Sequence, residues 1–119
     1  MGLISRLFRN DLALQKCLVE DAAHVVPGAI GEHVAKIQTA VSRLDGYRIG
    51  PEETVKYHYG ASTAAAVLAF KTRRRIINFS YQTQPDNIVG KMTIAILDKE
   101  LAALEARTLT LDPSGWSMS

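Results

Sequence analysis

Apolar residues recur at intervals of three and four along most of this chain, which is the spacing of one face of an α-helix. The clearest stretch covers residues 32–44, with apolar side chains at positions 34, 37, 41 and 44. Two more cover residues 61–73 and 91–106, and a shorter one covers residues 12–20. An Asn-Asp pair precedes the shorter stretch and can cap its first turn. The pattern predicts four helices and gives no basis for a sheet.

Proline and glycine separate these stretches. Residues 25–31 contain Val-Val-Pro-Gly-Ala-Ile-Gly, which interrupts regular structure. Gly46 follows the helix predicted at 32–44 and suits a left-handed C-terminal cap. Residues 47–59 are predicted to form a long polar connection. Residues 108–119 are predicted to form an irregular tail, in which we expect Trp116 to fold back over an apolar edge.

A short motif occurs twice, each time directly before a predicted helix. It reads Tyr59-Gly60-Ala61-Ser62-Thr63 in the first copy and Val89-Gly90-Lys91-Met92-Thr93 in the second. The glycine lets the backbone turn sharply into the helix. The threonine hydroxyl can satisfy backbone polar groups of the first turn, and the residue before the glycine can pack back onto the helix. The repetition indicates a duplicated loop–helix unit.

In its order along the chain, this pair of motifs resembles the peptidoglycan-binding-like domain family. That family has Tyr/Phe-Gly-x-x-Thr followed by Ala-Val-x-x-Phe-Gln, and then Asp-Gly-x-Val-Gly-x-x-Thr. The resemblance covers residues 32–101, with Lys71 in place of the usual Gln and Asn87 in place of the usual Gly. The positions that carry it are Tyr59, Gly60, Thr63, Val67, Phe70, Asp86, Asn87, Val89, Gly90 and Thr93.

The resemblance implies an all-α fold, a small orthogonal helical bundle of the peptidoglycan-binding-domain type. Three core helices with long loops would be joined by an additional N-terminal helix. The chain then divides into an N-terminal helical extension (1–31), the domain itself (32–107) and a C-terminal tail (108–119). The resemblance further implies a non-catalytic module, without a cofactor, that recognises bacterial cell-wall peptidoglycan.

The side chains that could carry out catalysis argue against an enzyme. The three histidines form no His-x-x-x-His pair, and the single Cys17 adds no ligand cluster, so we expect no metal site. Cys17 falls in an apolar pattern and is interpreted as a small buried residue. Glu52 and Glu53 are adjacent in a predicted loop, where we expect solvated charges without a partner acid. No catalytic residue is assigned.

Positive charge is concentrated in the run Lys71-Thr72-Arg73-Arg74-Arg75, whereas the whole chain has a formal net charge of only +2. The run falls at the end of a predicted helix, where it suits the negative end of the helix dipole. It also offers a contact for an anionic partner. No wide basic stripe accompanies it, which argues against nucleic acid as the partner.

A glycan is usually bound by an aromatic ring against one sugar face, with polar groups around it. Aromatic residues of the two long connections are therefore the candidates for glycan contacts, and Arg74 represents the basic run. The candidate ligand-binding residues are Tyr47, Tyr57, His58, Tyr81 and Arg74.

The N-terminal segment mixes apolar Leu3, Ile4, Leu7 and Phe8 with charged residues, so it lacks the continuous apolar stretch of a secretory signal. No run approaches the roughly 20 apolar residues of a membrane span. We expect the segment to dock on the chain's own core or on a partner. The protein is then expected in the cytoplasm at synthesis, and it would reach the envelope by a non-classical route or within a virion or secretion apparatus.

This localisation favours an alternative function. The same fold could serve as a structural or docking subunit of a larger protein assembly, such as a phage tail, an injection apparatus or a secretion system. Both functions are attachment without chemistry, and they differ in the partner: peptidoglycan glycopeptide or a protein assembly.

Overall fold

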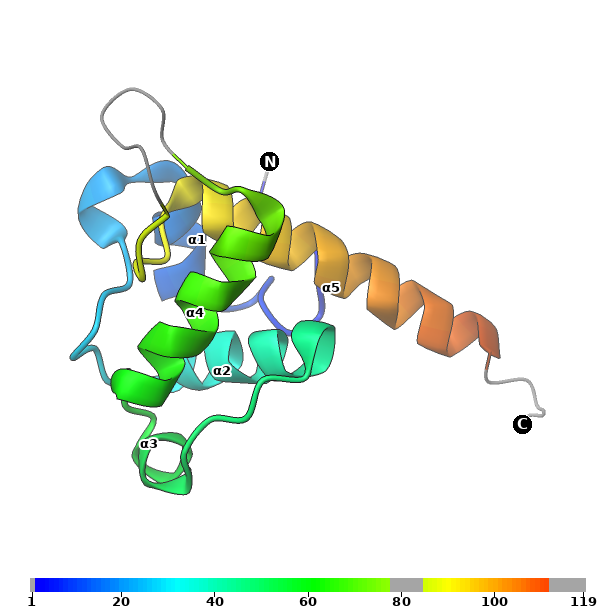
Figure 1. Ribbon diagram of the computed structural model, residues 1–119. Coiled ribbons are helices and arrows are strands. Elements are labelled where there is room, and N and C mark those ends of the chain that lie inside the picture. Colours follow the sequence, from blue (N-terminus) through cyan, green and yellow to red (C-terminus); the bar gives the residue numbers. More distant parts are fainter. Residues whose placement is uncertain (1, 78–84, 112–119) are drawn as a thin grey trace.

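Five α-helices make up the fold in the computed structural model, which describes residues 2–77 and 85–111. They are α1 (Leu12–Val19), α2 (Glu32–Asp45), α3 (Pro51–Lys56), α4 (Ala61–Arg74) and α5 (Lys91–Leu111), with a 3₁₀ turn at Asp21–Ala23. Both α1 and α2 contact α5, and α2 also contacts α4, which crosses in front of α5 in the view of Figure 1. No strand forms in the described ranges, so the expectation of an all-α helical bundle is confirmed. No described helix is both long and apolar enough to span a membrane.

The prediction of an uninterrupted loop at residues 47–59 was wrong, because α3 forms within it. Pro51 opens α3, at a position where a helix has no use for a backbone N–H. Glu52 and Glu53 lie in its first turn, where the helix dipole favours negative charge. The helix ends at Lys56 and is capped by Tyr57, which adopts a left-handed conformation with φ 55°. With six residues, α3 is too short to show an apolar period.

The predicted irregular tail was also wrong at its start, because α5 continues to Leu111. Neither proline nor glycine occurs between Gly90 and Pro113, so nothing in the sequence ends the helix earlier. Figure 1 shows the C-terminal half of α5 extending past the rest of the fold. Trp116 and the rest of residues 112–119 lie outside the described residues.

One hydrophobic core joins the N-terminal segment to the remaining helices. Phe8 and Leu14 are fully buried in the same core as Ile37 of α2, Phe70 of α4 and Leu97 of α5. Apolar side chains of the N-terminal segment and of α1 thus pack in the core that contains α5.

Acidic side chains of α5 hold the N-terminal segment by its backbone. Asp98 accepts hydrogen bonds from the N–H groups of Ile4 and Ser5 at 2.9 and 2.7 Å. Glu105 accepts one from the N–H of Arg6 at 2.8 Å. These contacts satisfy backbone donors of a segment that forms turns rather than a helix.

The expected docking of this segment on the chain's own core is confirmed for its buried side chains. Leu3 and Phe8 are buried, and Leu7 is half-buried against the core. Ile4 points to solvent instead, with 60% of its surface exposed.

Residues 25–31 run beside both copies of the repeated motif and tie them together. Val25 and Val89 exchange two backbone hydrogen bonds of 2.9 Å. A second pairing joins Ile30 to His58, and Tyr59 N–H donates to the carbonyl of Ala29 at 2.9 Å. This one segment therefore fixes the entry points of α4 and α5 relative to each other.

Candidate functional site

The two motif copies place matching residues in the interior. Tyr59 and Val89 are fully buried before their helices, and Thr63 and Thr93 are buried in the first turns. The Tyr59 hydroxyl donates to the carbonyl of Asn87, which links the first copy to the start of the second. Burial raises the pKa of Tyr59, so the hydroxyl stays protonated and available as a donor.

A buried carboxylate caps the N-terminus of α4. Glu53 accepts hydrogen bonds from the backbone N–H groups of Gly60, Ser62 and Thr63 at 3.1, 2.9 and 2.9 Å. These are N–H groups for which a helix supplies no partner of its own, and the positive end of the helix dipole favours the negative charge. The prediction of a solvated Glu53 was wrong, because α3 places this side chain under α4.

Hydrogen bonding keeps this carboxylate ionised. Burial acts to raise the pKa of Glu53, but hydrogen bonds from the Thr63 hydroxyl and from the backbone of Ser62 and Thr63 lower it to about 2. Both carboxylate oxygens are engaged, so Glu53 has no proton to donate near neutral pH. The role that this geometry supports is structural.

The Thr63 hydroxyl departs from the expected role of satisfying backbone groups. It donates to Glu53 Oε1 at 2.7 Å and accepts a hydrogen bond from Gln38 Nε2 at 3.0 Å. Thr63 therefore connects the cap of α4 to a side chain of α2. Glu53, Thr63 and Gln38 thus form one buried polar network.

The other end of the network is the side-chain amide of Gln38, which is 3% exposed. Besides Thr63, its Nε2 donates to the backbone carbonyl of His58 at 3.0 Å. Since a carbonyl oxygen only accepts hydrogen bonds, the amide nitrogen must face His58, and Oε1 must face away. Within the described part of the chain, Gln38 Oε1 receives no hydrogen bond.

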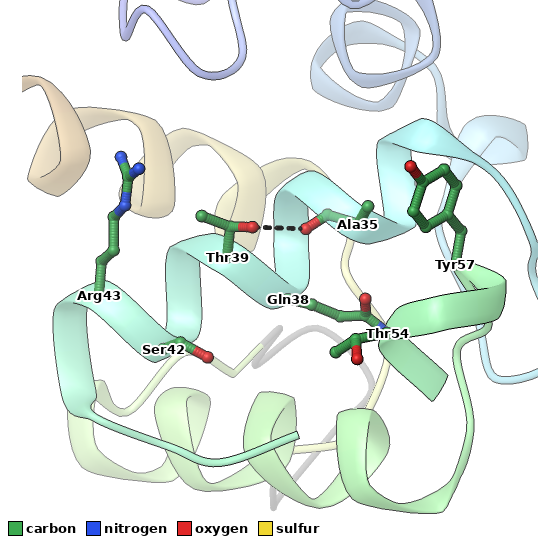
Figure 2. Close-up of a pocket in the computed structure, with 7 residues that line it drawn as sticks. All are labelled: Ala35, Gln38, Thr39, Ser42, Arg43, Thr54 and Tyr57. Atoms are coloured by element: carbon green, nitrogen blue, oxygen red, sulfur yellow. Dashed lines mark hydrogen bonds between the residues drawn. The ribbon is translucent and has the colours of Figure 1, made fainter. Parts of the chain in front are cut away.

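A groove of about 360 Å³ lies between α2 and the end of α3, and Gln38 forms part of its wall. Its volume is in the range of small-ligand sites, about 300–1,000 Å³. Figure 2 shows side chains of α2 along one side and Thr54 and Tyr57 on the other. The lining residues are Ala35, Gln38, Thr39, Ser42, Arg43, Thr54 and Tyr57.

The hydroxyl groups of the groove act as hydrogen-bond acceptors toward a ligand. Thr39 donates its proton to the carbonyl of Ala35 at 2.9 Å, and Ser42 donates to that of Tyr47 at 2.8 Å. Thr54 donates to the carbonyl of Pro51 in the same way. Because the protons are used within the fold, these three oxygens can act only as acceptors toward a ligand. With Gln38 Oε1, the groove suits a ligand rich in O–H and N–H groups.

Arg43 contributes the positive charge of the groove. It is exposed, and it forms no ion pair with any described residue. Its guanidinium group is therefore available to an anionic ligand group. A guanidinium group binds a carboxylate through two parallel hydrogen bonds.

Of the residues predicted from sequence to contact a ligand, Tyr57 lines the groove. The residue is 45% exposed, and its left-handed backbone follows directly on α3. His58 is half-buried and takes part through its backbone carbonyl, which orients Gln38. Tyr47 is half-buried against the core, and its carbonyl holds Ser42. Tyr81 lies outside the described residues.

The structure places Arg74 in an ion-pair network rather than in the groove. It donates two hydrogen bonds of 2.8 Å to Asp45 and two of 2.7 Å to Glu100, which joins α4 to α2 and α5. The guanidinium also lies 3.7 Å from the centroid of the Phe70 ring. These hydrogen bonds raise the pKa of Arg74 and hold the pKa of Asp45 below its usual range.

Lys71, at the other end of the basic run, is likewise engaged inside the fold. Its ammonium group donates to Asp86 at 2.5 Å and to the carbonyl of Ile88 at 2.7 Å, and the residue is only 6% exposed. It therefore ties α4 to the segment that enters α5. Two cations of the basic run serve the packing of the bundle.

Comparisons with family models, curated proteins and solved structures found no match to this chain. The geometry of the site therefore supplies the functional argument. No three His, Cys, Asp or Glu side chains of the described residues gather into a possible metal site. Cys17 is buried, and burial raises the pKa of its thiol to about 11, which leaves it protonated and a poor nucleophile.

Proposed function

We propose that this chain is a non-catalytic module that binds bacterial cell-wall peptidoglycan in the groove between α2 and α3. The observation that carries the proposal is a row of hydrogen-bond acceptors beside an exposed aromatic ring. Gln38, Thr39 and Ser42 supply acceptors from α2. The Tyr57 ring supplies the apolar face against which a sugar ring packs.

Peptidoglycan is a polymer of acylated amino sugars joined to short peptides, so it presents many O–H and N–H donors together with carboxylates. The acceptors of the groove and the cationic Arg43 match both kinds of group. The repeated helix-entry motif, with its resemblance to peptidoglycan-binding-like domains, favours the same ligand and the same type of bundle. Glu53 directly precedes Thr54, which lines the groove. Its buried carboxylate accepts hydrogen bonds from backbone N–H groups, which fits a binding role without catalysis.

A co-sedimentation assay with purified sacculi tests the proposal. The folded chain is expected to pellet with sacculi, and the heat-denatured chain, as the control, is expected to show only background binding. Measurement at several salt concentrations separates groove binding from adsorption by net charge, because adsorption weakens steeply with salt. Retention no greater than that of the denatured control, across salt and pH, would overturn the proposal.

The second candidate function is a docking subunit of a larger protein assembly, and α1 carries the observation that favours it. Leu12 and Val19 are 79% and 62% exposed, and their seven-residue spacing places them on one face of the helix. Exposed apolar pairs of this kind occur at protein interfaces. Under this proposal, Leu12→Ser and Val19→Ser weaken assembly with the partner. If these variants retain assembly and the wild-type chain alone stays monomeric at high concentration, the docking function is contradicted.

A further inference from the structure

The acceptor of Gln38 is fixed in place before any ligand arrives. Both protons of its amide group are committed, one to the His58 carbonyl and one to the Thr63 hydroxyl. Thr63 is in turn held by Glu53 at 2.7 Å, so the amide has no freedom to rotate. A buried acceptor without a donor destabilises a protein. A donor that enters the groove regains this free energy without reorganising the site.

The surroundings of Gln38 select among possible donors. In Figure 2 its amide lies between Thr54 and Tyr57, with Ala35 on the neighbouring turn of α2. The Ala35 methyl group and the Tyr57 ring give this end of the groove apolar surface beside the polar acceptor. An acetamido group has the complementary pair of features, an N–H donor next to a methyl group. A bare sugar hydroxyl offers the donor alone.

Arg43 adds a second contact point, on an exposed side chain that can adjust to a ligand. It follows Gln38 by five residues, a rise of about 7.5 Å along α2, and both residues line the groove, on different sides of the helix. A ligand that donates an amide proton to Gln38 can therefore place a nearby carboxylate against the Arg43 guanidinium. Charge-assisted pairs of this type are the stronger hydrogen bonds in proteins.

Resting on the proposed function, we propose that Gln38 and Arg43 form a two-point subsite for an N-acetylated amino sugar that bears a carboxylate. The acetamido N–H donates to Gln38 Oε1, the acetyl methyl packs against Ala35 and Tyr57, and the carboxylate pairs with Arg43. N-acetylmuramic acid carries both groups on one ring. The subsite thus binds the sugar of the polymer rather than its peptide.

Three β-1,4-linked disaccharides test the two points separately, with affinities measured by NMR titration of the whole chain. Cellobiose has no acetamido group, di-N-acetylchitobiose has acetamido groups without a carboxylate, and the disaccharide of N-acetylglucosamine and N-acetylmuramic acid has both. We expect affinity to rise in that order, by about tenfold at each step, which corresponds to about 1.4 kcal/mol. The side-chain carbonyl carbon of Gln38 is expected to shift downfield with the two acetylated ligands and to shift less with cellobiose, whose hydroxyl groups offer a donor without the adjacent methyl group.

Arg43→Gln is expected to bring the affinity for the muramic acid disaccharide down to that for di-N-acetylchitobiose and to leave the latter unchanged. Arg48→Gln is the matched control, because Arg48 is an exposed arginine that does not line the groove. Equal affinities for cellobiose and di-N-acetylchitobiose, or an unmoved Gln38 carbonyl, would overturn the subsite. If sacculi still retain the chain in that case, the proposed function stands and the subsite alone fails. A chain that sacculi do not retain contradicts both.

Discussion

The carboxylate of Glu53 packs directly against Gly60 and leaves no space for a side chain there. The Gly60 N–H donates to Glu53 Oε1 at 3.1 Å, and a Cβ atom at Gly60 would lie 2.6 Å from the carboxyl carbon of Glu53. The glycine is needed here for the close approach of a side chain, since its φ of −101° is open to any residue. This contact positions α3 against α4, and α3 forms one wall of the groove.

Gly60→Ala is therefore expected to destabilise the fold by at least about 2 kcal/mol, because the methyl group displaces a carboxylate from three backbone donors. Gly90→Ala is the matched variant in the second motif copy, where a Cβ would meet the His24 ring at 3.0 Å. A side chain can shift by a few tenths of an ångström, so we expect a loss below about 1 kcal/mol. Urea unfolding of both variants checks the difference, and equal losses would contradict the assigned role of Glu53.

The acid stability of the protein should depend on Glu53. Its pKa is about 2 in the folded state against a usual value of 4.5, so the ionised carboxylate stabilises the fold above pH 4.5. This contribution, on the order of 3 kcal/mol, is lost as the pH falls toward 2, where the folded state also becomes protonated. Glu53→Gln should be less stable at pH 7 and should lack this part of the loss in acid. Unfolding free energies at pH 7, 5, 4 and 3 test this, and parallel curves for the two proteins would contradict it.

Arg74→Lys should lower stability and leave ligand binding intact. A lysine cannot donate paired hydrogen bonds to Asp45 and Glu100 at once, so we expect a loss of about 1–3 kcal/mol. Retention on sacculi should equal that of the wild type below the melting transition. Impaired retention at unchanged stability would instead make Arg74 a ligand-binding residue, as its position in the basic run suggested.

Tyr57→Ala should weaken binding to sacculi by about tenfold, because the aromatic face for the sugar is lost. Folding should be nearly unaffected, since the residue is 45% exposed. Val55→Ala is the control: Val55 lies in α3 two residues before Tyr57, is 78% exposed and does not line the groove. Equal binding by both variants would show that the ligand does not contact the Tyr57 side of the groove.

The spacing of apolar residues predicted the long helices well. It failed for α3, which is stabilised by a polar contact and not by an apolar face. The end of α2 follows from Gly46, which adopts the expected left-handed cap with φ 74°. The amphipathic spacing of α4 likewise gave its end to within one residue. Residues 51–56 gave no such signal, because α3 buries a single residue, Glu53. Its stability comes from a contact with Gly60 that no local pattern contains.

The candidate site was only partly predictable for the same reason. Tyr57 was found because aromatic residues in loops are natural sugar contacts. The sequence signal for Gln38 is its position: this polar residue lies beside Ile37 and one turn before Val41, among the apolar residues of the helix. The direction of its free oxygen depends on His58 and Thr63, which lie 20 and 25 residues away in sequence. Long-range hydrogen bonds of this kind appear only once the fold is known.

A titration of the isotope-labelled chain with soluble peptidoglycan fragments, followed by ¹H–¹⁵N NMR, tests the central claim most directly. If the groove between α2 and α3 is the binding site, the largest amide shifts will fall on residues 35–43 and 54–57, and α1 will be unaffected. Absent shifts, or shifts confined to the exposed face of α1, would contradict a peptidoglycan site in this groove.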